Sequence, residues 1–173
     1  MGDHVVTGRG IGSVCPYVVA TGRHQRTLLV DMLLTTPAGL LGDPRLHSGA
    51  HLSVGPRPSY ETNTVRPWLR VGFHDGFGAA FFCDETTPAG QDWAWAAIAE
   101  QPLDNPPTVY FDQDAETAFP PCSVMPLDRL RVVVLEWVDT GRRPTGVRWL
   151  PVNSLAWRID DTGQARPVTD VRS

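Results

Sequence analysis

Cysteine and histidine are the residue types in this chain best suited to nucleophilic chemistry. The cysteines are Cys15, Cys83 and Cys122, and His74 is the histidine that can be placed beside a thiol on paper. A catalytic thiol needs a lowered pKa and a base within hydrogen-bond reach, and nothing in the spacing selects such a pair. Three distant cysteines also fit neither a disulfide framework nor a four-thiolate zinc site. We therefore expect small buried side chains, with a small cysteine-dependent enzyme as the alternative.

Two histidines, His47 and His51, have the i, i+4 spacing that would aim both rings at one metal ion on a helix. Gly49 lies between them and prolines bracket the region, so no helix is expected there. Metal sites need three or four ligands, and no third ligand is evident. The glycine-rich residues 7–13 neither follow a clear strand nor end in Lys-Ser/Thr, which argues against a phosphate-binding loop. We expect loop histidines, no bound metal and a flexible leader.

The dipeptide Pro121-Cys122 matches the first half of the P-C-x-x-C motif of zinc nucleobase deaminases. In those enzymes thiolates and a histidine hold zinc, and the glutamate of an H-x-E motif moves protons. Here Met125 occupies the second thiolate position, and no histidine is followed two residues later by glutamate. The sequence therefore excludes a zinc deaminase, and it contains no G-x-S-x-G elbow. We predict a protein without catalytic residues or cofactors.

Length and composition favour one soluble domain. The 173 residues, 42% of them hydrophobic, can bury one core, and no linker or repeat divides residues 1–173. The formal charge is −4, and the 15 basic residues, all arginine, give no reason to expect direct nucleic-acid binding. No apolar run approaches the roughly 20 residues of a membrane helix, and the N-terminus lacks the layout of a secretory signal. We expect a cytoplasmic protein with flexible residues at 1–13 and 160–173.

A C-terminal helix is predicted over 126–140 by its end signals. Pro126 suits the first helical position, Asp128 puts a negative charge in the first turn, and Gly141 supplies a left-handed cap. The valines at 132–134 would favour a strand by propensity, and only the end signals decide for a helix. The apolar face that should meet the core consists of Leu127, Leu130, Val134, Trp137 and Val138.

A β-hairpin is predicted over 68–84. Asp75-Gly76 is the pair preferred in a two-residue type I′ turn, and it lies between two strand-like runs. If that turn holds, counting outward pairs Leu69 with Phe82 on one face. The other face, which includes Phe81, is less apolar and should be partly exposed.

The remaining segments complete an α+β fold, with a mainly antiparallel sheet and both helices packed on it. An N-terminal helix is predicted over 22–35, where the apolar stripe comprises Leu28, Leu29, Met32 and Leu33. The further strands expected are 14–20, 51–54, 92–98, 108–112 and 146–150.

The order of motifs in the C-terminal half resembles the first-described Imm family of polymorphic-toxin immunity proteins. The motifs are Val109-Tyr110-Phe111-Asp112, Phe119-Pro120, Val124-Met125-Pro126-Leu127, the helix, Thr140-Gly141-Arg142-Arg143-Pro144 and Val147-x-Trp149. The hairpin strands also resemble the middle of the family, so the resemblance covers about 68–150. Such proteins are common in actinobacteria, which the lysine-free composition would suit.

The resemblance implies a non-catalytic inhibitor that binds and neutralises a toxin encoded beside it. This family is often paired with zinc-dependent DNA cytosine deaminase toxins, whose active site or substrate groove the inhibitor would occlude. Such toxins need basic grooves for nucleic acid, and an acidic binder can be steered to them. Tight binding would need an aromatic anchor inside a polar rim. The candidate partner-binding residues are Asp84, Glu85, Asp92, Trp93, Trp95, Asp112, Asp114 and Glu116.

Three hypotheses stay open at this point. The first is the immunity protein, and the second is a small enzyme that uses Cys83 or Cys122 with His74, which predicts a low-pKa thiol. The third is a small-molecule binding domain, which predicts a ligand-dependent rise in melting temperature without a protein partner. For Trp93 and Trp95, core packing of at least one of them is the alternative to partner binding.

Overall fold

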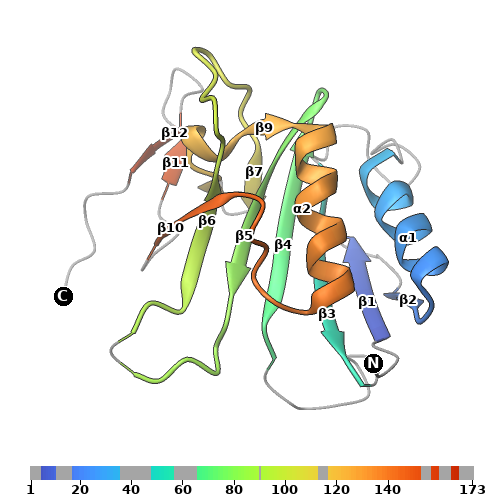
Figure 1. The fold of residues 1–173 in the computed structure, drawn as a ribbon. Helices are drawn as coiled ribbons and strands as arrows, with labels where there is room; N and C mark the ends of the chain where they lie inside the picture. Colours follow the sequence, from blue (N-terminus) through green and yellow to red (C-terminus); the bar gives the residue numbers. More distant parts are fainter. Residues whose placement is uncertain are drawn as a thin grey trace.

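The helices α1 (Arg23–Thr35) and α2 (Leu127–Thr140) lie on one face of a large antiparallel sheet (Figure 1). The structure, a computed structural model, describes residues 5–10, 17–35, 48–56, 66–89, 91–112, 117–152, 157–159 and 165–167. The large sheet has the order β10-β6-β5-β4-β3-β1-β2, and β9 pairs with β5 off this path. A smaller sheet has the order β12-β11-β8-β7. The predicted α+β fold with a mainly antiparallel sheet is confirmed.

The element bounds place each strand in these two sheets. The large sheet contains β1 (Val5–Gly10), β2 (Tyr17–Ala20), β3 (Ser48–Gly55), β4 (Trp68–His74), β5 (Phe77–Cys83), β6 (Ala94–Ile98), β9 (Met125–Pro126) and β10 (Arg148–Pro151). The smaller sheet contains β7 (Tyr110–Asp112), β8 (Thr117–Ala118), β11 (Trp157–Ile159) and β12 (Ala165–Pro167). A short 3-10 helix, η3 (Pro121–Ser123), precedes β9. Within the described part of the chain, no helix is long and apolar enough to cross a membrane.

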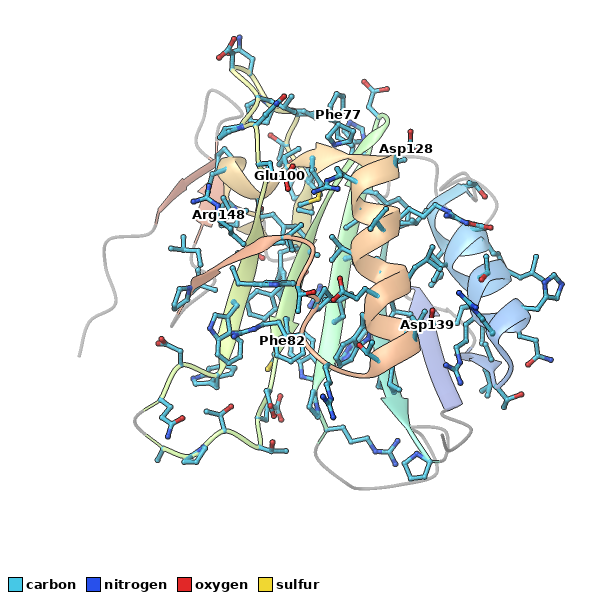
Figure 2. All side chains as sticks on the ribbon, viewed as in Figure 1. Phe77, Phe82, Glu100, Asp128, Asp139 and Arg148 are labelled. Carbon is cyan, nitrogen blue, oxygen red and sulfur yellow. The ribbon has the colours of Figure 1, made fainter. Side chains whose placement is uncertain are left out.

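The C-terminal helix α2 (Leu127–Thr140) forms where its end signals predict it. Pro126 is the N-cap rather than the first helical residue, and Asp128 lies in the first turn. Gly141 ends the helix with a φ of 64°, and its N–H donates to the Trp137 carbonyl over 2.7 Å. Figure 2 labels Asp128 and Asp139 near the two ends of this helix. The buried residues of α2 are Leu130, Val133, Val134, Trp137 and Val138.

The N-terminal helix α1 (Arg23–Thr35) also forms as predicted, but its apolar stripe is only half right. Leu29 and Leu33 are buried, whereas Leu28 and Met32 are 53% and 42% exposed. The buried face continues instead through Val30 and Leu34 and includes the Arg26 guanidinium. Arg26 Nη1 donates to the Val138 carbonyl at the end of α2 over 3.3 Å. This hydrogen bond favours the observed rotation of α1, because it places a cation at the negative end of the α2 dipole.

The central hairpin has the register predicted from its turn. Asp75 and Gly76 have φ values of 50° and 79°, as a type I′ turn requires, and Leu69 pairs with Phe82. The face of Phe82 packs under α2, where the ring lies 5.4 Å from the Trp137 ring. The Asp75-Gly76 turn alone was therefore sufficient to predict which side of the sheet each hairpin side chain faces.

The opposite face of the hairpin is buried, so the prediction of partial exposure is wrong for Phe81 and Cys83, which are 2% and 0% exposed. Phe119 and Val109, which flank strands of the smaller sheet, cover this face and form a second core with these residues. Gly72 allows the close approach of the two sheets, since a Cβ there would lie 2.6 Å from the Tyr110 carbonyl oxygen. The hairpin is thus covered on both faces.

Two segments assigned to flexible ends from the sequence belong to strands. Residues 5–10 form β1, which pairs with β2 on one side and β3 on the other. Residues 165–167 form β12, which pairs with β11. Gly8 and Gly10 interrupt the apolar alternation of β1, so the pattern gave no strand signal there. The other terminal residues of the predicted flexible ends lie outside the described residues.

Candidate protein-binding surface

One exposed surface forms where β5 ends and β6 begins. The Asp84 N–H donates to the Trp93 carbonyl over 2.8 Å, which extends the β5–β6 ladder by one step beyond Cys83 and Ala94. This backbone contact gathers four of the predicted residues at one end of the large sheet. We call Asp84, Glu85, Asp92 and Trp93 the Trp93 surface.

The carboxylates of the Trp93 surface differ in how firmly they are held. Asp84 Oδ1 accepts hydrogen bonds from the Thr86 N–H and hydroxyl over 3.0 and 2.5 Å. Glu85 Oε1 accepts from the Trp68 indole N–H over 3.1 Å. Asp92 is exposed. Two of the carboxylates are therefore oriented by the fold before any partner arrives, which lowers the entropy cost of binding.

The two candidate tryptophans have different environments. Trp93 is 44% exposed, although it is one of the largest apolar side chains of the chain. Trp95 is partly buried, with its ring 5.6 Å from Phe82. Because the ladder continues to residue 93, strand alternation puts both rings on the helix side of the sheet. Trp95 thus contributes to the core, whereas Trp93 presents an apolar ring to solvent.

Asp112 does not join the Trp93 surface. It lies on β7 in the smaller sheet, where Oδ2 is 4.0 Å from Arg70 Nη2. The Arg70 guanidinium also stacks 3.9 Å from the centre of the Phe111 ring, on the sheet face opposite Trp95. Asp112 therefore has a partner within the fold. The remaining two predicted rim acids, at positions 114 and 116, lie outside the described residues.

A further feature, which the sequence did not single out, is the connection between α2 and β10. The Glu136 carboxylate accepts hydrogen bonds from the Thr145 N–H, the Thr145 hydroxyl and the Gly146 N–H, over 2.6, 2.8 and 3.1 Å. The Trp149 indole N–H donates to the Pro144 carbonyl over 2.7 Å. We call residues 141–147 the arginine loop. The signal available in the sequence is the pair of adjacent arginines, Arg142 and Arg143, within this loop.

The hydrogen bonds to Glu136 make a pH-dependent contribution to stability. Burial alone would raise the pKa of Glu136, but the donors of Thr145 and Gly146 outweigh it and hold the pKa below its ordinary value of 4.5. Because the folded-state pKa is the lower one, this stabilisation is present at neutral pH and is lost as pH falls below about 4.5 through the folded-state pKa. We expect urea unfolding to show that Glu136→Gln costs stability at pH 7 and less at pH 3. An equal cost at both pH values would contradict this assignment.

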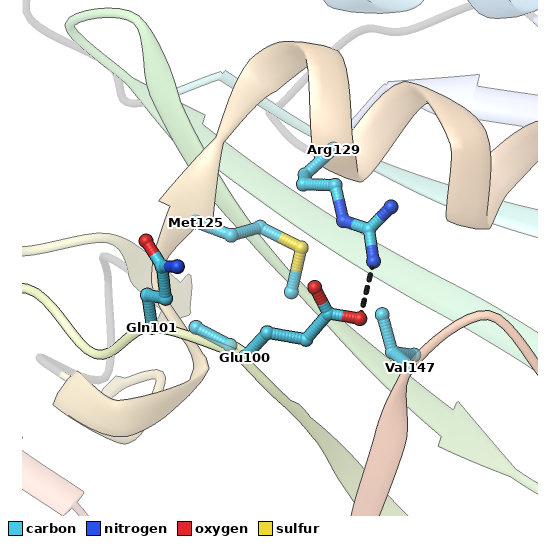
Figure 3. Close-up of a pocket in the computed structure, with 6 residues that line it drawn as sticks. Glu100, Gln101, Met125, Arg129 and Val147 are labelled. Atoms are coloured by element: carbon cyan, nitrogen blue, oxygen red, sulfur yellow. Dashed lines mark hydrogen bonds and ion pairs between the residues drawn. The ribbon is translucent and has the colours of Figure 1, made fainter.

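A small cavity of about 310 Å³ lies at the other end of β6. Its apolar walls include Ala99, Met125 and Val147, and Arg129 Nη2 contacts Glu100 Oε1 over 2.7 Å at its side (Figure 3). Gln101 completes the lining. The cavity is separated from the Trp93 surface by the length of β6, since Trp93 precedes that strand and Glu100 follows it. A small-molecule binding domain would have to use a space of this kind.

The described thiols do not have the features of a catalytic cysteine. Cys83 and His74 lie at opposite ends of the hairpin: His74 pairs with Phe77, and Cys83 lies six residues further along β5, about 20 Å away. Burial, together with Glu85 and Asp84, raises the pKa of Cys83 to about 12. Burial also raises the pKa of Cys122.

The raised thiol pKa values predict slow alkylation of the native protein. At pH 8 only about one Cys83 thiol in ten thousand would be ionised, and the thiolate is the reactive species. We expect iodoacetamide to label Cys83 and Cys122 far more slowly in the native protein than in urea, with peptide masses identifying each site. Labelling of either cysteine in the native protein at the rate seen in urea would restore the cysteine-enzyme hypothesis.

Only one of the two histidines with metal-ligand spacing lies in the described part of the chain. His51 lies on β3 with its ring 4.7 Å from the Trp68 ring, and His47 lies outside the described residues. Among the described residues, no three histidine, cysteine, aspartate or glutamate side chains are grouped as a metal ion would require.

An exposed tryptophan at the end of a sheet is the kind of side chain that a protein partner can bury. The comparison with known families agrees: a family model described as "Immunity protein Imm1" matches residues 27–151, more than half of the chain. The chain belongs to the Imm1 family of immunity proteins, whose role is to counter a toxin. No curated protein matches the chain.

Proposed function

We propose that this immunity protein neutralises a DNA cytosine deaminase toxin by covering its active site or substrate groove with the Trp93 surface. The observation that carries the proposal is Trp93 itself, which is 44% exposed and whose carbonyl accepts the N–H of Asp84, a residue with an oriented carboxylate. Tryptophan is enriched among the residues that dominate binding energy, and surrounding polar groups exclude water from it. The proposed complex forms in the cytoplasm and involves neither nucleic acid nor membrane.

Charge complementarity supports the proposal that the toxin acts on DNA. An enzyme that acts on DNA needs a positively charged groove, because phosphate contacts supply most non-specific affinity. Carboxylates from Asp84, Glu85 and Asp92 can occupy such a groove, and the chain as a whole carries a formal charge of −4. Complementary charge of this kind raises the association rate and suppresses wrong partners. The acids at positions 114 and 116 remain proposed rim residues, whereas Asp112 pairs with Arg70 on the opposite face of the sheet.

Co-expression with the toxin domain of the neighbouring gene tests the proposal. We expect the wild-type protein to restore bacterial growth, and Glu85→Gln/Asp92→Asn to restore it only at higher expression. In unprotected cells the deaminase assignment predicts C-to-T changes in host DNA. Absence of growth protection by the wild-type protein would reject the immunity function for that toxin. Protection without C-to-T changes in unprotected cells would reject only the deaminase.

A further inference from the structure

The arginine loop, residues 141–147, is fixed more firmly than a connection between a helix and a strand requires. The Gly141 cap holds its start, and the Glu136 carboxylate holds Thr145 and Gly146 near its end. Pro144 is buried in between. An exposed loop held at both ends and in the middle is already ordered before a partner binds, so little conformational entropy is lost on binding.

Arg143 is the side chain that this loop presents. It is exposed, and its guanidinium carbon lies 4.3 Å from the centre of the Trp95 ring. Stacking of this kind is favourable for a planar guanidinium and restricts its orientation. Among the described residues, none accepts a hydrogen bond from this guanidinium, and none forms an ion pair with it. Within the described part of the chain, the donors of this exposed guanidinium are therefore available while its plane is supported by Trp95.

The hydrogen-bonding partner that best matches such a guanidinium is a carboxylate. A guanidinium presents parallel N–H donors whose spacing matches the two oxygens of a carboxylate, and such charge-assisted pairs are among the stronger hydrogen bonds. Trp93 lies two residues before Trp95, and the ladder contact of its carbonyl with Asp84 puts it on the same side of the sheet by strand alternation, about 7 Å along the chain from Trp95. A partner segment that fits both carries an acidic side chain next to an apolar one.

We propose that Arg143, stacked on Trp95, is the receptor for an aspartate or glutamate side chain of the partner toxin, and that Glu136 is the residue that positions it. This inference rests on the proposed immunity function and adds a site of opposite charge to the Trp93 surface. Carboxylates on one side and an arginine on the other fix the orientation of the partner, because a reversed arrangement would bring like charges together.

The test measures the affinity of the purified full-length protein for the toxin domain of the neighbouring gene by titration calorimetry. Arg143→Ala is expected to raise Kd about 10- to 100-fold, and Arg143→Lys less, since lysine keeps the charge but loses the planar donor pair. Arg148→Ala is the matched control, because Arg148 is also exposed but lies on β10 opposite Ile98, away from Trp95. It should change Kd less than twofold.

A double-mutant cycle tests the positioning role of Glu136. Glu136→Gln should weaken binding in the wild-type background and have little further effect once Arg143 is alanine, because it acts through that side chain. If Glu136→Gln caused a general loss of structure, it would instead weaken toxin binding equally in the wild-type and Arg143→Ala backgrounds. A Kd for Arg143→Ala within twofold of the wild-type Kd would overturn this inference alone. Absence of toxin binding by the wild-type protein would reject both this inference and the proposed function.

Discussion

Replacement of Trp137 by alanine is expected to lower the free energy of unfolding by about 3–5 kcal/mol, the largest effect of any single substitution considered for this fold. Trp137 is 0% exposed and is the largest of the fully buried side chains. It joins α2 to the sheet through Phe82, so its removal leaves a cavity between the two layers. Urea unfolding followed by circular dichroism measures the change, and the melting temperature should fall by roughly 6–20 °C.

Two further variants of α2 test whether lost packing is the cause of the stability loss in Trp137→Ala. Trp137→Phe keeps an aromatic ring against Phe82 and removes an indole N–H that has no hydrogen-bond partner among the described residues. We expect it to cost less than half as much as alanine. Val132→Ala changes a side chain that is 49% exposed on the same helix and should cost less than about 1 kcal/mol. Equal losses for Trp137→Ala and Val132→Ala would contradict the described core.

The second large effect concerns binding rather than stability. Trp93→Ala should weaken toxin binding by about 2–4 kcal/mol, which is roughly 30- to 800-fold in Kd. The reason is that Trp93 is the exposed aromatic side chain within the acidic surface, and burial of such a ring supplies much of an interface's energy. Surface plasmon resonance with the immobilised toxin domain measures the change, which should lie mainly in the dissociation rate.

The matched control for Trp93→Ala is Leu28→Ala on α1. Leu28 is 53% exposed, and α1 lies over the β1–β2 side of the sheet, away from β6 (Figure 1). We expect this variant to bind the toxin as the wild type does, and both variants to unfold at nearly the wild-type urea concentration. If Leu28→Ala weakens binding and Trp93→Ala does not, the toxin binds the molecule near α1 instead.

The parts of the fold that depend on local chemistry could be predicted from the sequence. The Asp75-Gly76 turn determines the hairpin register, and the Gly141 cap with its following proline determines where α2 ends. The strand propensity of residues 132–134 did not prevail, because Val133 and Val134 belong to the buried face of the helix. Local signals sufficed where neighbours in sequence are also neighbours in space.

Features that depend on distant contacts could not be predicted. Phe81 is buried because Val109 and Phe119 return over the hairpin, and no local pattern records that return. Likewise, the rotation of α1 depends on Arg26 reaching the last turn of α2. A sequence pattern gives the period of an element, but the layer that covers each face depends on topology.

The candidate site also combines features set by local sequence with features set by distant contacts. Asp84 and Glu85 are neighbours in sequence, and one backbone hydrogen bond in the structure brings Asp92 and Trp93 next to them. It separates Asp112, which pairs with Arg70 on the other side of the sheet. The contact of Arg143 with Trp95 joins residues 48 positions apart in the sequence and has no local signature.

The most direct test of the account is a titration of the purified toxin domain from the neighbouring gene with this protein, with toxin activity and complex mass measured on the same samples. The account predicts a one-to-one complex and loss of toxin activity as the ratio reaches one. Toxin that stays fully active and separate from the protein at micromolar concentrations of both would contradict it.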